Sequence, residues 1–330
     1  LSEASYFFCG IGGSGMSALA SMLARHGAKV SGSDRGYDCG QSPEKFARLE
    51  QEGIALYPQD GSGIHDNLTA VIVSSAVEDS IPDIKRAKEV GCLIWKRAYL
   101  LAKRFNESKG IAIGGTSGKT TVTAMTGYLM DRSGVSPTIV NGGVMVDRFD
   151  NVTATGNTVI GKEGGWFVAE TDESDRSIDM FDPKIAVLTN ISLDHRPLEE
   201  LREIFYQFVK RAEQGIVLNI DDAETLPLYE RANNAFPQKI MTVSLKNTQA
   251  DLYTQSIKHE PGAVSFQVAL REGDKLIKDI PPIRIKTPGN HNVSNALMAI
   301  AAAIRAGVPA GDACASMEGF TGVKRRMEVI

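Results

Sequence analysis

Short apolar runs with polar ends alternate with amphipathic stretches over the first third of the chain. The runs at Tyr6–Cys9, Ala28–Asp34 and Thr69–Val77 predict strands, and the stretch after the first glycine-rich turn predicts a helix. The sequence "CLIWKRAYLL" (92–101) continues the alternation. Because strands that alternate with helices form parallel sheets with right-handed crossovers, this pattern predicts one α/β domain over 1–107.

A second α/β domain is predicted over 108–323, after the polar stretch Arg104–Gly110, which is typical of a linker. Residues 240–286 alternate apolar and polar positions with period two, which predicts an antiparallel β subregion. Residues 291–307 predict a long helix that a glycine closes. Further apolar strands are expected at "IAIGG" (111–115), "GWFVAE" (165–170), "IAVLTNI" (185–191) and "GIVLNI" (215–220).

Composition narrows the class of protein only slightly. A hydrophobic content of 42% and a charged content of 23% predict folded cores rather than disorder. The net charge of −4 gives no reason to expect nucleic acid or a membrane surface as a partner. The four cysteines lie far apart without a C-x-x-C pair, which fits a reducing compartment and argues against a zinc ribbon. No apolar run approaches the roughly 18 residues of a membrane span, so we expect a cytoplasmic protein.

The first predicted strand leads into a glycine-rich turn, "FFCGIGGSGMSALA" (7–20), in which Gly10, Gly12 and Gly15 form G-x-G-x-x-G. Asp34 follows about 20 residues later, at the position where dinucleotide-binding proteins hold an adenosine ribose. The backbone N–H groups of such a turn and of the following helix N-terminus bind any diphosphate. The turn alone therefore leaves a NAD(P) oxidoreductase and other nucleotide-binding proteins open.

A second glycine-rich turn, "AIGGTSGKTTVTAM" (112–125), joins a predicted strand to a predicted helix. Its backbone can cradle phosphates, Lys119 can neutralise them and the Thr120 hydroxyl can bind Mg²⁺. The common phosphate loop has glycine where this chain has Ile113, so the loop is a shortened form. The alternative, a glycine turn with an exposed lysine, is disfavoured by G-K-T-T at a strand-to-helix junction. The predicted fold class is α/β: an N-terminal Rossmann-like parallel-sheet domain, then a P-loop-type central ATPase domain with an antiparallel β subregion.

Polar clusters are expected at the ends of three further elements. The carboxylates of "AETDESD" (169–175) suit Mg²⁺ at the carboxyl end of a strand, and the alternative is a solvated acidic loop. His195 follows another strand and is a candidate ligand or orienting group, although a lone histidine is more often structural. Asn292 and Asn295 share one face of a helix that begins near His291, and asparagine capping of that helix explains them equally well.

These segments, in this order, resemble the Mur ligases, which are ATP-dependent amide-bond-forming enzymes of peptidoglycan precursor synthesis. The match is closest to the branch that adds L-alanine, and it covers essentially the whole chain. The motifs that carry the resemblance are "GIGGSGMSALA" (10–20), "SGSD" (31–34), "VSSAV" (73–77), "GTSGKTT" (115–121), "VNGG" (140–143), "AETDESD" (169–175), "TNISLDH" (189–195), "PGNHNVSNALMAIA" (288–301) and "GVKRRME" (322–328).

The resemblance implies a ligase that uses ATP and Mg²⁺ to join L-alanine to UDP-N-acetylmuramate through an acyl phosphate. Lys119, Glu170 and His195 would be catalytic, and Thr120, Glu170 and His195 would hold the metal. The implied ATP site comprises Gly115, Thr116, Ser117, Gly118, Lys119, Thr120, Thr121, His291, Asn292, Asn295 and Arg326. The first glycine-rich turn would hold the diphosphate of the UDP-sugar instead of NAD. The implied substrate site comprises Gly12, Ser14, Gly15, Met16, Ser17, Asp34, Ser74, Ser75, Arg97, Asn141, Gly142 and Gly143.

The resemblance also implies a third domain, which would bind the incoming amino acid and begin near Lys324. Residues 324–330 are therefore expected to be its start, and we expect the 330 residues to have little or no ligase activity alone. We also expect a monomer or a weak homodimer, with no nucleic-acid or membrane partner.

Three positions depart from the alanine-adding pattern. Ser117 replaces a histidine, Val122 replaces a threonine, and Arg196-Pro197 replaces a Met-Asp pair after the D-H motif. The lysine and threonine of the phosphate loop are intact, so these departures leave ATP use in place and the acceptor open. The alternatives are a murein-tripeptide recycling ligase, a paralogue with another acceptor and a non-catalytic nucleotide-binding regulator. A NAD(P) oxidoreductase would leave the second glycine-rich turn unexplained.

Overall fold

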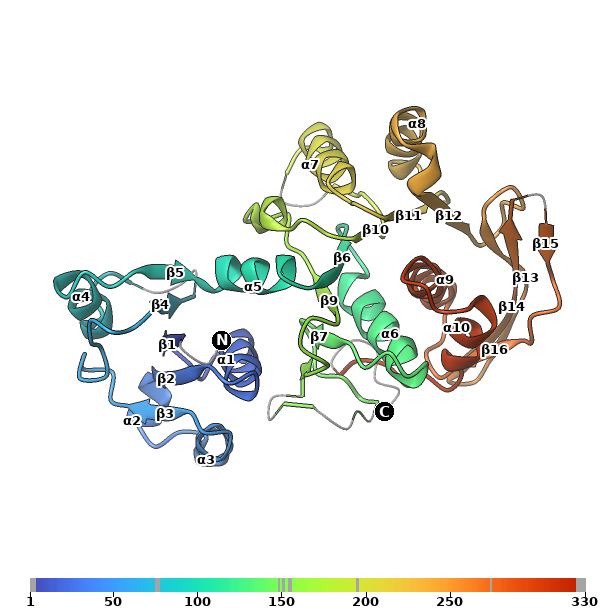
Figure 1. Ribbon diagram of the computed structural model, residues 1–330. Coiled ribbons are helices and arrows are strands. Elements are labelled where there is room, and N and C mark those ends of the chain that lie inside the picture. The colour runs from blue at the N-terminus through green and yellow to red at the C-terminus, as the bar shows by residue number, and fades with distance from the viewer. Residues whose placement is uncertain are drawn as a thin grey trace. The chain divides into compact units, whose positions relative to one another are not determined.

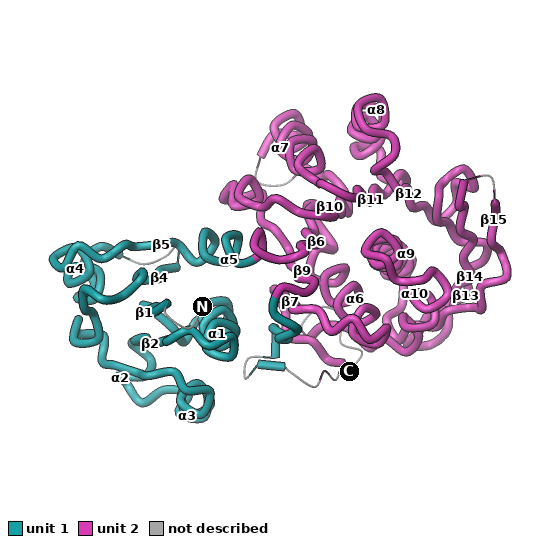
Figure 2. Tube along the Cα trace, viewed as in Figure 1, with its two compact units in different colours: residues 1–104, 150–163 teal, residues 105–149, 164–330 magenta. Residues whose placement is uncertain are grey.

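A computed structural model describes residues 4–74, 78–147, 149, 152–153, 156–193, 196–273 and 275–324. The chain divides into two compact units: unit 1 comprises 1–104 and 150–163, and unit 2 comprises 105–149 and 164–330 (Figure 2). The sequence predicts two continuous domains, whereas the structure groups 150–163 with unit 1. The expected boundary at 107/108 stays a prediction.

Unit 1 is built on a parallel sheet in the order β3-β2-β1-β4-β5 (Figure 1). The order reverses between β1 and β4, and ligands of open α/β sheets bind outside the carboxyl ends of strands at such a point. The strands are β1 (Ser5–Cys9), β2 (Lys29–Ser33), β3 (Ala55–Tyr57), β4 (Ala70–Val73) and β5 (Ile94–Lys96). The 150–163 segment carries the short strand β8 (Thr158–Val159), which does not belong to this sheet. The helices are α1 (Ser14–Arg25), α2 (Arg35–Asp38), α3 (Pro43–Gln51), α4 (Pro82–Glu89) and α5 (Arg97–Asn106).

The central strand β1 is buried, which explains its unbroken apolar sequence. Phe7 and Cys9 pack with Val71 of β4 and Ile84 of α4, and Phe8 is completely buried as well. Successive side chains of a strand point to opposite faces, so both faces of the sheet are covered here.

Unit 2 is built on a larger mixed sheet in the order β15-β14-β13-β12-β11-β10-β6-β9-β7, with β16 paired to β14. Neighbouring strands from β7 to β13 are parallel, and the pairs that β14 makes with β13, β15 and β16 are antiparallel. The strands are β6 (Lys109–Gly114), β7 (Thr138–Val140), β9 (Trp166–Glu170), β10 (Ile185–Leu188), β11 (Gly215–Asn219), β12 (Ile240–Ser244), β13 (Leu252–Glu260), β14 (Ala263–Glu272), β15 (Lys275–Ile277) and β16 (Ile283–Ile285).

Helices cover both faces of the unit 2 sheet (Figure 1). On one face α6 (Lys119–Arg132), α9 (Asn290–Arg305) and α10 (Ala310–Ser316) pack together, and on the other α7 (Leu198–Lys210) packs against α8 (Thr225–Ala235). Short 3-10 turns are η1 (Ser177–Met180) and η2 (Pro237–Lys239). Within the described residues, no helix combines the length and apolar character needed to cross a membrane.

This architecture confirms the α/β class, the parallel N-terminal sheet and the antiparallel β subregion. The predicted linker at Arg104–Gly110 is wrong, because α5 extends to Asn106 and β6 begins at Lys109. The prediction failed because the polar residues on the exposed side of a helix end have the same composition as a linker. The first strand of the 240–286 region also differs from the prediction: β12 pairs in parallel with β11 and β13. The helix α8 connects β11 to β12, and a helical crossover produces parallel strands.

A buried carboxylate lies in the core of unit 1. Asp83 of α4 is completely buried and accepts hydrogen bonds from the Ser33 hydroxyl and, at 2.8 Å, from the Gly61 N–H. Burial raises the pKa of Asp83 above its ordinary value of 3.8, since the low-dielectric interior disfavours the charged form. Burial likewise raises the pKa of the nearby Cys9 thiol to about 12, so this thiol stays protonated near neutral pH.

The raised pKa of Asp83 predicts a specific pH dependence of stability. A carboxyl whose pKa is higher in the folded state contributes stability at low pH, and this contribution is lost as the pH rises through the raised pKa. The stability of unit 1 should therefore decline as the pH rises above 3.8, and we expect Asp83→Asn to remove this decline. The measurement is the melting temperature of unit 1 between pH 4 and 7, followed by Trp95 fluorescence in a Trp166→Phe background.

Asp60→Asn is a second test rather than a neutral control, because the Asp60 charge itself helps to raise the pKa of Asp83. The Ser62 hydroxyl and N–H lower the pKa of Asp60, so its contribution has the opposite sign and is lost as the pH falls. If Asp83→Asn and the parent chain lose stability in parallel as the pH rises, Asp83 does not titrate as described.

Candidate nucleotide-binding site

The second glycine-rich turn connects β6 to α6 and has a backbone that only glycine adopts without strain. Gly115 has φ +128° and Gly118 has φ +84°. A Cβ at Gly115 would lie 2.0 Å from the Thr189 hydroxyl, and one at Gly118 would lie 2.9 Å from Asn295 Oδ1. Gly118 is also the N-cap of α6 and supplies no side-chain acceptor to its first turn. The turn therefore presents backbone N–H groups at a helix N-terminus, where anions bind.

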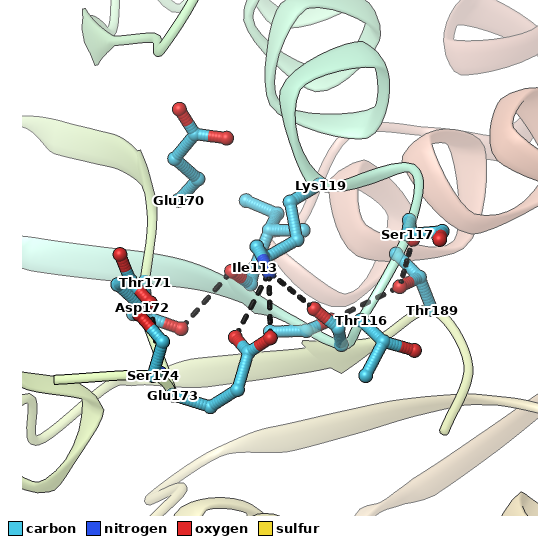
Figure 3. Close-up of polar contacts among 12 residues, drawn as sticks. Ile113, Thr116, Ser117, Lys119, Glu170, Thr171, Asp172, Glu173, Ser174 and Thr189 are labelled. Atoms are coloured by element: carbon cyan, nitrogen blue, oxygen red, sulfur yellow. Dashed lines mark hydrogen bonds and ion pairs between the residues drawn. The ribbon is translucent and has the colours of Figure 1, made fainter. Parts of the chain in front are cut away.

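Two side chains from the end of β10 hold this turn in place. The Thr189 hydroxyl donates to the Ser117 carbonyl at 2.6 Å (Figure 3). Asn190 Nδ2 donates to the same oxygen at 2.9 Å. Asn190 Oδ1 accepts from the Thr116 hydroxyl at 2.8 Å and from the Ser117 N–H at 3.1 Å. The sequence analysis placed both residues in a motif but gave neither a role. Their position directly after an apolar strand was the one sequence feature that could have pointed to a role at this turn.

Lys119, the expected phosphate-binding lysine, points back across the turn. Its ammonium donates to the Gly115 carbonyl at 2.6 Å and to the two carboxylate oxygens of Glu173 at 3.0 and 2.8 Å (Figure 3). Glu173 was not singled out from the sequence, because the resemblance implied a role for Glu170 alone among the acids of "AETDESD".

Thr120 and Glu170, the expected metal ligands, lie together. The Thr120 hydroxyl donates to Glu170 Oε2 at 2.8 Å. A Cβ at Gly142 would lie 1.9 Å from Glu170 Oε1, so the expected substrate loop of Asn141, Gly142 and Gly143 packs directly against this carboxylate. Asn141 Oδ1 is buried and accepts no hydrogen bond from the described residues.

These oxygen atoms fit Mg²⁺, which prefers hard oxygen ligands and keeps only one or two carboxylates. Among the described residues no group of three or more His, Cys, Asp and Glu side chains could hold a metal ion. A Mg²⁺ bound by Thr120 and Glu170 would therefore complete its shell with phosphate and water. His195, the third expected ligand, lies outside the described residues, as do Ser75 and Arg326.

The start of α9 also reaches the turn. Asn295 lies beside Gly118, and its assignment to an ATP site stays a prediction. Asn292 is buried and its amide donates to the Pro288 carbonyl at 2.8 Å. The N-cap of α9 is Gly289, so asparagine capping does not explain these residues. His291 is exposed beside the same glycine.

A short antiparallel tether ties the substrate loop to the far end of unit 2. Met145 pairs with Val323, and Asp147 Oδ1 accepts from the Thr321 hydroxyl at 2.8 Å and from its N–H at 3.1 Å. Burial raises the pKa of Asp147, against the opposing effect of these hydrogen bonds. A Cβ at Gly143 would lie 2.5 Å from Val323, so the tether directly supports the loop beside Glu170.

The first glycine-rich turn, in unit 1, is held by Asp34. Its Oδ2 accepts from the Gly12 N–H at 2.7 Å and its Oδ1 accepts from the Gly36 N–H at 2.8 Å. Arg97 lies over the start of α1, with its guanidinium 3.3 Å from the position of a Cβ at Gly15. Lys45, which the sequence analysis did not select, donates to the Gly12 carbonyl. Positive charge at a helix N-terminus suits an anion, so this arrangement fits the expected site, whose ligand stays a prediction.

The other expected substrate residues of unit 1 differ in exposure. Ser14 is exposed and Ser74 is half-buried, whereas the side chains of Met16 and Ser17 are buried in α1. The Ser17 hydroxyl donates to the Gly13 carbonyl at 2.9 Å. Their assignment to a substrate site stays a prediction.

The fold and these two turns define a nucleotide-binding α/β protein with a shortened phosphate loop. The chain belongs to the Mur ligase family: residues 5–109 match the family model described as Mur ligase family, catalytic domain, and residues 113–303 match the Mur ligase middle domain.

Several curated and solved proteins resemble the chain along nearly its whole length. A UDP-N-acetylmuramate--L-alanine ligase of Dinoroseobacter shibae is 35% identical over 97% of this chain, and one of Jannaschia sp. is 34% identical over 98%. The chain spans 66% and 65% of the lengths of these relatives.

Solved structures show the same fold. The crystal structure of a UDP-N-acetylmuramate-alanine ligase from Thermotoga maritima has a TM-score of 0.77 at 28% identity, covering 98% of this chain and 70% of its own. A murein peptide ligase from Psychrobacter arcticus has a TM-score of 0.80 at 24% identity, covering 99% and 70%.

The contact between Gly115 and Thr189 predicts that Gly115→Ala destroys the phosphate loop. The new methyl group would meet both a left-handed backbone and the Thr189 hydroxyl, which together cost more than about 2 kcal/mol. We expect a lower melting temperature of unit 2, measured by Trp166 fluorescence in a Trp95→Phe background, and loss of ADP binding.

Gly134→Ala is the matched control. Gly134 has φ +78° but nothing within 4 Å of a Cβ, so it measures backbone strain alone. Strain of this kind costs roughly 1–2 kcal/mol. Equal destabilisation by the two variants, with ADP binding retained in both, would contradict the packing role of Thr189.

Proposed function

We propose that the chain is the UDP-sugar- and ATP-binding part of a ligase that joins L-alanine to UDP-N-acetylmuramate. The observation that carries the proposal is the phosphate loop with Lys119 and with Thr120 bonded to Glu170. The relatives named above as UDP-N-acetylmuramate--L-alanine ligases support the choice of substrates.

The proposed reaction has two steps. A carboxylate oxygen of the sugar attacks the γ-phosphorus of ATP, the bond to the ADP oxygen breaks, and an acyl phosphate forms. The amine nitrogen of alanine then attacks the acyl carbon, loses a proton, and inorganic phosphate leaves. Like charges meet in the first step, so positioning and neutralisation of charge supply most of the catalysis.

The residues of unit 2 have separate tasks in this proposal. The backbone N–H groups from Gly115 to Gly118 bind the phosphates, and Lys119 neutralises the transferring phosphoryl group. Thr120 and Glu170 hold Mg²⁺, with His195 as a further ligand. When bound, Mg²⁺ neutralises phosphate charge and acts as a Lewis acid. His291, Asn292, Asn295 and Arg326 contact ATP.

The proposed role of the first glycine-rich turn is to bind the diphosphate of the UDP-sugar. In an NAD-binding protein the acid after the second strand accepts the ribose hydroxyls. Here both oxygens of Asp34 accept backbone N–H groups of the turn and of α2. Arg97 and Lys45 add positive charge that suits a diphosphate.

A murein peptide ligase is the second candidate for the acceptor side. The observation that leaves the acceptor open is Arg196, where the alanine-adding pattern has methionine. The Arg196 guanidinium donates to the Ser174 carbonyl at 2.9 Å, which fixes the acidic loop after β9 in a way that pattern does not supply. An activity assay of the enzyme separates the two candidates. Activity with L-alanine supports the first, and activity with the tripeptide L-alanyl-γ-D-glutamyl-meso-diaminopimelate supports the second.

Calorimetric titrations test the proposed ligands. We expect UDP-N-acetylmuramate and Mg-ADP to bind the 330-residue chain and NADH not to bind it. Lys119→Met should weaken ADP binding about 10- to 100-fold, because a hydrogen bond to a charged group contributes about 1.5–3 kcal/mol.

Lys246→Met is the control, since it removes the same charge from an exposed position after β12. It should leave ADP binding unchanged. Binding of NADH without binding of the UDP-sugar would overturn the proposal for unit 1.

A further inference from the structure

We propose that Glu173 is a positioning residue that competes with nucleotide phosphate for the Lys119 ammonium. The proposal rests on the ATP site proposed above and adds to it a carboxylate to which the sequence motifs gave no role of its own. Glu173 holds Lys119 ready in the phosphate loop and, by doing so, weakens the binding of every anion that needs the same lysine.

The Lys119 ammonium already uses all its hydrogen-bond donors within the protein. An ammonium has three N–H donors, and in this structure the acceptors are one carbonyl oxygen of Gly115 and two carboxylate oxygens of Glu173 (Figure 3). A phosphate oxygen that approaches Lys119 must therefore displace at least one of them. The Lys119 and Glu173 side chains are 18% and 7% exposed, so solvent screens this exchange only weakly.

The loop that carries Glu173 is held by hydrogen bonds on both sides of this residue. The Thr171 N–H and hydroxyl donate to the Ile113 carbonyl at 2.9 and 3.1 Å. The Ser174 N–H and hydroxyl donate to Asp172 Oδ1 at 2.8 and 2.6 Å, and Arg196 donates to the Ser174 carbonyl at 2.9 Å. The Glu173 side chain is the more buried of the two, at 7% exposed against 18% for Lys119, so we expect the longer lysine side chain to be the partner that moves.

Movement of Lys119 would leave the negative charge of Glu173 behind in a buried position. When Lys119 turns toward a phosphate, the carboxylate of Glu173 remains buried with a weakened ion pair, and breaking a buried pair is costly. Its negative charge also faces the incoming phosphate. Both effects lower the affinity for nucleotide, and both disappear when Glu173 becomes a neutral amide of the same shape.

The test compares ADP affinities by calorimetry in the 330-residue chain. Glu173→Gln should tighten ADP binding about tenfold, a gain of affinity that loss of a merely structural contact does not produce. Asp175→Asn is the matched control: it removes the same charge from the same loop, and an asparagine oxygen can still cap the Ser177 N–H as Asp175 Oδ1 does. It should leave the affinity for ADP unchanged.

Unchanged or weaker ADP binding by Glu173→Gln, with the parent chain binding ADP, overturns this inference and leaves the proposed function intact. Failure of the parent chain to bind ADP overturns the proposed function instead. If Glu173→Gln does not fold, Glu173→Asp takes its place, because the shorter side chain withdraws the carboxylate from Lys119 and keeps the charge. It should tighten ADP binding by a smaller factor, and unchanged or weaker binding again overturns the inference.

Discussion

The register of three parallel strands is the constraint on which the nucleotide site depends. Pairing of β6 with β10 places Gly114 beside Leu188, and pairing of β6 with β9 places Ile113 beside Glu170. The phosphate loop, Thr189 and Glu170 therefore emerge at one edge of the sheet within a residue of one another. A slip of one residue in either pairing would turn these side chains to the opposite face. The apolar runs of the strands, buried on both faces, hold that register.

The two units hold their glycine-rich turns in the same way. In unit 2 the amide of Asn190, just after β10, receives and donates hydrogen bonds along the phosphate loop. In unit 1 the carboxylate of Asp34, just after β2, receives the Gly12 N–H. In each case a side chain at the end of the adjacent parallel strand pairs with backbone groups of the turn. Each turn is thus formed before any ligand arrives, which lowers the entropic cost of binding.

The sequence predicted those features that depend on local pattern. Alternating apolar runs identified the strands around both turns, and G-K-T-T after a strand identified Lys119 and Thr120. The identity of the lysine's partner depended on side-chain direction in an irregular acidic loop, so Glu173 could not be told from its neighbours. Lys45 was missed because it reaches the Gly12 carbonyl from a helix that carries no motif. The parallel pairing of β12 was missed because alternation of polarity does not encode strand direction.

The tether between Asp147 and Thr321 has a consequence for biosynthesis. These residues lie 174 positions apart, and Val323 supports the glycine loop that packs against Glu170. A chain emerging from a ribosome exposes β6, α6 and β9 long before it exposes Val323. The phosphate loop and its acidic partner therefore exist in an incomplete form during most of the synthesis of unit 2. Contacts of such long sequence separation also slow folding, because a long loop must close before they stabilise anything. Completion of the nucleotide site is thus one of the last events in the maturation of this unit.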